Sequence, residues 1–227
     1  MQFQTITQTG SIAAQQNKVL RNTYMMLALT MVPTVIGANI GASMNLSFMA
    51  ESPIMSALLM FGAMFGMLFA VNALRNSVWG IAALLGFTFV AGVFLGPILQ
   101  VALQLSNGAE LVGMAAGGTG LIFFSLATIA TVTKKDFSFM GKFLFIGLIM
   151  LIVASLANLF FQVPALTLTI SAVAVLIFSA YILFDISRIV HGGETNYVMA
   201  TLGIYMSIYN LFINLLQLLM AFSGQRD

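Results

Sequence analysis

YILFDISRIVHGGETNYVMATLGIYMSIYNLFINLLQ, residues 181–217, decides how this chain folds, because it joins polar side chains to two strongly apolar segments. Asp185 lies near the end of the first segment, and a short loop with Arg188, His191 and Glu194 leads to the second. Along the second segment, small and polar residues recur at alternating spacings of four and three, which places them on one face of a helix. This stripe consists of Asn196, Ala200, Gly203, Ser207, Asn210, Asn214, Gln217 and Ala221.

The composition requires a membrane environment for these segments. Hydrophobic residues make up 60% of the chain and charged residues 6%, with a mean hydropathy of +1.05. Soluble domains usually contain about a quarter charged residues. The chain is therefore predicted to be an all-α integral membrane protein. A polar stripe facing lipid would be energetically unfavourable, so we expect the last helix to lie inside a bundle of the others.

Seven apolar segments are each close to the ~20 residues that cross a hydrocarbon core. The expected spans are residues 24–44, 53–73, 78–99, 111–132, 143–161, 165–187 and 197–222. Residues 1–20 are predicted to form a flexible polar tail, because residues 1–17 carry no charged side chain and no apolar core. Residues 21–227 then form the seven-helix transmembrane domain.

The basic residues predict the orientation of the chain. With seven spans and a cytoplasmic N-terminus, only Arg226 of the eight basic residues falls on the far side. The cytoplasmic set is Lys18, Arg21, Arg75, Lys134, Lys135, Lys142 and Arg188. We therefore expect the N-terminus inside and the C-terminus outside. The net charge of +2 reflects this topology, and no nucleic-acid partner is expected.

Glycine pairs at GxxxG spacing predict close helix packing in the first four spans. The pairs are Gly37 with Gly41, Gly62 with Gly66, Gly92 with Gly96, and Gly113 with Gly117. Pro97, directly after Gly96, is expected to end or kink the third helix, because proline lacks a backbone donor.

The sequence lacks the residues that catalytic and metal-binding sites require. The chain has one histidine and no cysteine. Asp185 is the one plausible carboxylate within a span, so a metal centre, a Ser-His pair or a pair of catalytic aspartates is not expected. We expect neither an enzyme nor a bound cofactor.

Two interpretations of Asp185 remain open. It is either an interfacial carboxylate paired with Arg188 one turn later, or an ionisable group that faces a cavity and titrates. In the second case membrane burial disfavours the charged form and a nearby cation favours it, so the pair would act as a pH-sensitive latch. Arg75, predicted at the same depth, is the candidate partner from another helix.

The loop after Asp185 and the middle of the last helix carry further candidates. His191 and Glu194 belong to a glycine-containing turn, with Thr195 or Asn196 expected to cap the last helix. A regulatory protonation of His191 is the alternative interpretation. Tyr205 and Tyr209 need hydroxyl partners inside the bundle, and Asn158 is a candidate.

Several motifs resemble those of the Bax inhibitor-1 family of seven-helix membrane proteins, and within it the bacterial YccA-type branch. They are KVLRNTYMMLALT (18–30), GPILQ (96–100), KKDFSFMGK (134–142), FDISRIVHGGETNY (184–197) and YNLFINLL (209–216). The similarity runs from about Lys18 to the C-terminus. The resemblance implies a bundle of six helices around a central seventh.

The resemblance also implies two functions. Some family members conduct calcium in a pH-dependent way through two aspartates; Asp185 matches the first, and Ser207 stands at the position of the second. One carboxylate and one hydroxyl bind a divalent cation poorly. The YccA-type branch resembles instead a modulator of the membrane-anchored ATP-dependent protease FtsH. The sequence thus favours a protease modulator in the bacterial inner membrane, with a pH-sensitive Ca²⁺ or H⁺ leak through Asp185 as the alternative.

Overall fold

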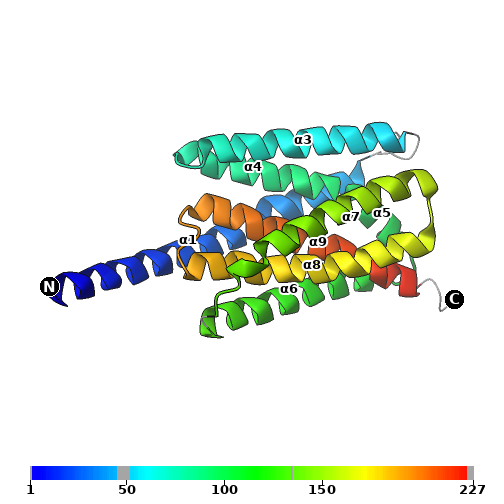
Figure 1. The fold of residues 1–227 in the computed structure, drawn as a ribbon. Coiled ribbons are helices and arrows are strands. Elements are labelled where there is room, and N and C mark those ends of the chain that lie inside the picture. Colours follow the sequence, from blue (N-terminus) through cyan, green and yellow to red (C-terminus); the bar gives the residue numbers. More distant parts are fainter. Residues whose placement is uncertain (1, 45–51, 134, 224–227) are drawn as a thin grey trace.

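The computed structural model describes residues 2–44, 52–133 and 135–223, and these residues form helices without any β-strand (Figure 1). The elements are α1 (Gln2–Ser43), α3 (Pro53–Leu74), α4 (Val78–Phe94), α5 (Gly96–Leu103), α6 (Gly108–Thr133), the 3-10 turn η1 (Ser138–Met140), α7 (Gly141–Phe161), α8 (Pro164–Val190) and α9 (Tyr197–Ser223). Seven helical stretches among them are long and apolar enough to cross a membrane, with α4 and α5 together forming one stretch. The predicted seven-helix membrane fold is confirmed.

Proline and glycine determine where several helices begin and end. Pro53 and Pro164 each stand at the start of a helix, where the missing N–H has no intrahelical partner to lose. Gln162 adopts φ 51°, the left-handed conformation that ends α7. At Leu95 the helix breaks between α4 and α5, as the Gly96-Pro97 pair predicts.

The N-terminal residues are helical in this structure. Residues 2–17, predicted as a polar tail, form the first turns of α1, which projects beyond the other helices (Figure 1). The membrane-spanning part of α1 begins at Ala14. The flexibility of the segment stays a prediction.

Helix α9 packs mainly against α8, α6 and α1, and it also contacts α3, α4 and α5. Helix α7 packs against α8 and η1. The predicted arrangement of six helices around a central seventh is therefore not confirmed. Side chains of α4, α8 and α9 form the centre of the main core, and those without solvent exposure include Leu84, Phe87, Ile182, Ile186, Ile204 and Leu211.

Two of the four glycine pairs bring helices into backbone contact. A methyl group at Gly37 or Gly41 of α1 would overlap the carbonyl oxygens of Phe89 and Val93 on α4. From the opposite side, a methyl group at Gly92 would overlap the carbonyl oxygen of Thr34. The α1–α4 crossing thus depends on glycine. At the other two pairs, on α3 and α6, an added methyl group would meet no neighbouring atom within 4 Å.

Polar side chains join the helices inside the bundle. The Tyr205 hydroxyl lies 2.9 Å from Thr34 Oγ1 and donates to the carbonyl of Thr88 at 3.3 Å. Tyr209 donates to the carbonyl of Ala91 at 3.0 Å. The predicted partner Asn158 is wrong, because its amide instead donates to Thr167 Oγ1 at the α7–α8 turn. Tyrosines of α9 therefore bind to α1 and α4.

We predict that Gly92→Ala destabilises the protein, because the added methyl group would push the Thr34 backbone and α1 away. Overpacking of this kind usually costs about 1–3 kcal/mol. Gly62→Ala on α3 is the matched control, because its methyl group would meet no atom within 4 Å and alanine favours a helix over glycine. The measurement is thermal unfolding in detergent: Gly92→Ala should lower the Tm and Gly62→Ala should not. Equal Tm values for the two variants would contradict the proposed packing.

Candidate functional site

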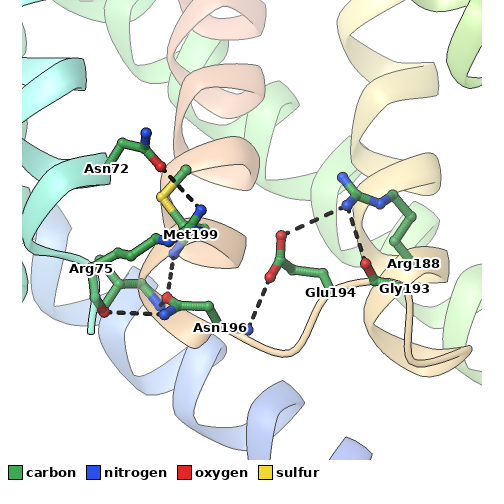
Figure 2. Close-up of polar contacts among 8 residues, drawn as sticks. Asn72, Arg75, Arg188, Gly193, Glu194, Asn196 and Met199 are labelled. Carbon is green, nitrogen blue, oxygen red and sulfur yellow. Dashed lines mark hydrogen bonds and ion pairs between the residues drawn. The ribbon is translucent and has the colours of Figure 1, made fainter.

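The residues singled out in the sequence meet at the end of the bundle where α8 ends and α9 begins. Helix α8 ends at Val190, and Gly192 follows with φ +78°, a conformation that glycine adopts without strain. The chain then turns through Glu194 to α9. The α3–α4 turn lies beside this loop, as Figure 2 shows through the contact between Arg75 and Asn196.

Asn196 caps α9 and links it to the α3–α4 turn. Its Oδ1 accepts hydrogen bonds from the backbone N–H groups of Val198 and Met199, at 3.0 and 3.1 Å. Its Nδ2 donates to the carbonyl of Arg75 at 3.1 Å and to Asn76 Oδ1 at 2.9 Å. The predicted cap is confirmed for Asn196. One side chain thereby fixes the start of α9 against another helix pair.

Glu194 and Arg188 hold the loop against the end of α8 (Figure 2). Glu194 Oε1 accepts the N–H of Asn196 at 2.9 Å, and its Oε2 lies 3.7 Å from Arg188 Nη2. The same Nη2 donates to the Gly193 carbonyl at 3.2 Å. The Arg188 guanidinium also lies 5.6 Å from the centre of the Phe184 ring. Because these charged side chains are partly exposed, the ion pair contributes about 0–1 kcal/mol.

Asp185 lines a cavity of about 320 Å³ between α3, α8 and α9. Arg188 and Glu194 line the same cavity, together with Leu68 and Met206. The carboxylate packs against α9 at Gly203, where a side chain would place its Cβ 3.2 Å from Asp185 Oδ2. The glycine therefore leaves the space that the carboxylate occupies. The cavity combines two carboxylates and one guanidinium with apolar walls.

Two predicted neighbours of Asp185 lie elsewhere. Arg75 is exposed and donates to Asn72 Oδ1 at 3.1 Å. Ser207 is buried, and its hydroxyl donates to the carbonyl of Gly203 on its own helix at 3.1 Å. Neither residue lines the cavity, whereas Arg188 does. The structure thus brings Asp185 together with Arg188 and Glu194, a residue assigned only to the loop from the sequence.

The polar stripe of α9 satisfies most of its hydrogen bonds within the helix. Asn210 donates to the carbonyl of Met206 and Asn214 to that of Asn210, both at 2.8 Å. Gln217 Oε1 instead accepts a hydrogen bond from Ser171 Oγ of α8 at 2.9 Å. The stripe therefore contacts α8 at two positions, Gly203 and Gln217.

The α6–α7 loop closes the same end of the bundle through Ser187. Ser187 Oγ accepts the backbone N–H of Phe137 at 2.9 Å, and His191 Nδ1 lies 2.8 Å from the Ser187 carbonyl oxygen. Hydrogen bonds from Ser138 hold the pKa of Asp136 below its ordinary value, so this carboxyl stays ionised at neutral pH. Sequence reasoning missed Ser187, because an isolated serine on an apolar helix gives no signal of a long-range contact.

Comparisons with known proteins identify the family of the chain. The family model described as "Inhibitor of apoptosis-promoting Bax1" matches residues 16–224. The "Modulator of FtsH protease YccA" of Escherichia coli K12 is 42% identical over 203 residues, which cover 89% of this chain and 90% of the relative. The "Inner membrane protein YccA" of Escherichia coli O6:H1 matches equally well. An "Uncharacterized membrane protein" of Vibrio cholerae is 41% identical over 94% of both chains. The chain therefore belongs to the Bax inhibitor-1 family of membrane proteins.

Proposed function

We propose that this protein resides in the bacterial inner membrane and modulates a membrane-anchored ATP-dependent protease of the FtsH type by binding to it. The observation that carries the proposal is the 42% identity, over about nine-tenths of both chains, to a relative named a modulator of that protease. The name describes a regulator, which supports a role in binding rather than catalysis. The resemblance of residues 134–142 and 184–197 to the YccA-type branch supports the same assignment.

The shape of the N-terminal region supports a contact with such a protease. Helix α1 begins at Gln2 and extends beyond the bundle, whereas its membrane-spanning part begins at Ala14. A projecting segment without charged residues is accessible to an ATP-driven unfolding ring on the same side of the membrane. We therefore propose residues 2–13 as the segment that the protease engages.

Deletion of residues 2–13 should reduce association with the protease and lengthen the half-life of the protein. The deletion leaves the span from Ala14 intact, so the bundle is expected to fold. A Gly-Ser segment of the same length replaces these residues in the control, which separates the effect of length from that of sequence. The measurements are co-purification with the host's FtsH-type protease and a pulse-chase half-life. Association and turnover equal to wild type in the deletion would refute engagement of this segment.

We propose a cytoplasmic N-terminus and a periplasmic C-terminus. The start of α1, the α3–α4 turn, the α6–α7 loop and the α8–α9 loop lie at one end of the bundle (Figure 1). Arg75, Lys135 and Arg188 belong to these segments, and Arg21 lies within the first eight residues of the α1 stretch that begins at Ala14. An excess of basic residues at one end is typical of the cytoplasmic side.

Single cysteines test this orientation, because the chain contains no cysteine of its own. Ser106→Cys lies in the turn before α6, and Thr195→Cys lies at the opposite end, in the α8–α9 loop; both positions are exposed. A membrane-impermeant thiol reagent should label Ser106→Cys in spheroplasts and Thr195→Cys only after lysis. The reverse pattern would overturn the orientation.

A second candidate function is a pH-sensitive leak of Ca²⁺ or H⁺ through Asp185. The observation that favours it is the cavity of about 320 Å³ in which Asp185 lies beside Arg188 and Glu194. Ionisable groups at membrane depth commonly mark ion or proton paths. Within the described residues, no group of three or more His, Cys, Asp or Glu side chains is placed to hold a metal ion. The geometry therefore favours a protonation-controlled path over a stable calcium site.

If the leak exists, Asp185→Asn should abolish the pH dependence of flux in proteoliposomes, because the amide cannot titrate. Glu110→Gln, an exposed acidic position at the start of α6 outside the cavity, is the matched control and should keep the wild-type profile. Calcium and proton flux are measured at several pH values with folded protein. An unchanged profile in Asp185→Asn, or no flux above that of empty liposomes, removes the second candidate and leaves the protease proposal intact.

A further inference from the structure

A second and larger cavity lies between α1 and α6, outside the site at Asp185. Its volume is about 1280 Å³, and its lining includes no residue of the Asp185 cavity. Its lining residues come from α1, α5, α6 and α9. Representative lining residues are Leu27 and Met31 of α1, Ala116 and Phe123 of α6, and Ile208 and Phe212 of α9. We call this cavity the α1–α6 groove.

The α1–α6 groove runs along most of the membrane span. Its lining extends from Leu20 and Thr131 near one end of the bundle to Leu103 and Val112 near the other. All four residues belong to the membrane-spanning stretches 14–43, 78–103 and 108–133. The groove therefore runs along the membrane-spanning stretches, and its described lining residues carry no ionisable side chain except the tyrosines.

The chemistry of the walls limits the possible occupants of the groove. Its volume is about 1280 Å³, and its described lining is apolar apart from a few hydroxyl and amide groups. An acyl chain is thin, apolar and already present at this depth. The apolar walls thus favour a lipid chain.

Exposed basic side chains lie near one end of the groove. Arg21 precedes the groove residue Tyr24 by three positions on α1, which places it roughly 60° around the helix from the groove face. Lys135 follows the end of α6, beyond the groove residue Thr131. Both side chains are exposed and form no ion pair with any described residue. Asp136 is an acidic neighbour at this end, and its carboxylate accepts a hydrogen bond from the backbone N–H of Ser138.

We propose that the α1–α6 groove binds an anionic phospholipid, with an acyl chain along α9 and the phosphate beside Arg21 and Lys135. Guanidinium and ammonium groups bind phosphate oxygens, and juxtamembrane basic residues attract anionic lipids. The apolar walls hold the chain, and the basic end distinguishes an anionic headgroup from a zwitterionic one. The proposal is independent of the protease function.

Two pairs of variants test the proposed acyl-chain site and the proposed headgroup site separately. A side chain at Gly120 projects into open space, since no atom lies within 4 Å of a Cβ there, and Gly120 lines the groove. Gly120→Phe therefore adds a ring on the groove wall with no close contact at Cβ. Gly62→Phe on α3 makes the same change at an equally open glycine outside the groove. Arg21→Gln removes the headgroup contact, and Lys142→Gln removes a basic residue from α7 as its control.

The experiment is native mass spectrometry of the detergent-purified, delipidated full chain, with added phosphatidylglycerol or phosphatidylcholine carrying identical acyl chains. Wild type should retain phosphatidylglycerol to higher collision energy than phosphatidylcholine. Gly120→Phe should lose the retained lipid, and Arg21→Gln should lose the preference for phosphatidylglycerol. Gly62→Phe and Lys142→Gln should behave as wild type.

Other results would overturn the proposal. Equal retention of both lipids by wild type would show only non-specific lipid at the protein surface. Retention by Gly120→Phe equal to that of Gly62→Phe would show that the lipid binds elsewhere. If thermal unfolding shows that Gly120→Phe is not folded, Ala116→Phe fills the same exposed wall of the groove and provides the same comparison. Lipid retention by folded Ala116→Phe would likewise contradict the assignment.

Discussion

The main physical constraint on this protein is that α9 carries polar side chains through a hydrocarbon environment. An unpaired polar group there has no water to bind, so each group needs a partner within the protein. Asn210 and Asn214 use the backbone of α9 itself, whereas Tyr205, Tyr209 and Gln217 reach α1, α4 and α8. These contacts require neighbouring helices to approach closely. The glycines at the α1–α4 crossing and Gly203 beside Asp185 permit that approach.

The sequence predicts well those features that depend on local chemistry. Seven apolar stretches of sufficient length, the break at Gly96-Pro97 and the cap at Asn196 all follow from nearby residues, and the structure contains them. The GxxxG spacing predicts close packing for Gly37, Gly41, Gly92 and Gly96. The same spacing predicts close packing wrongly for Gly62 and Gly113, where an added Cβ would meet no atom within 4 Å. The spacing shows that another helix can approach closely, but it does not show whether one does.

Features that depend on the relative position of distant helices could not be predicted. For Tyr205 the sequence suggests a partner on the wrong helix, since a buried hydroxyl can donate to any nearby oxygen and the sequence does not specify which helix is near. The position of α7 on α8 and the groove between α1 and α6 arise in the same way. The sequence marks Asp185 as a candidate, because a carboxylate in an apolar segment is unusual. It does not indicate that Glu194, nine residues later and beyond a glycine turn, lines the same cavity.

The candidate site joins two sequence motifs of the family into one structural unit. Ser187 of the α8 motif binds Phe137 of the α6–α7 loop, and Asn196 binds the α3–α4 turn, so the end of the bundle with the exposed basic residues is tightly connected. Such an end offers a defined surface beside the projecting start of α1. The most direct test is reconstitution of the purified chain with an FtsH-type protease in vesicles, followed by measurement of degradation of a membrane-protein substrate. The account predicts that degradation changes with increasing amounts of the chain and then saturates. A degradation rate that stays constant at every ratio would contradict it.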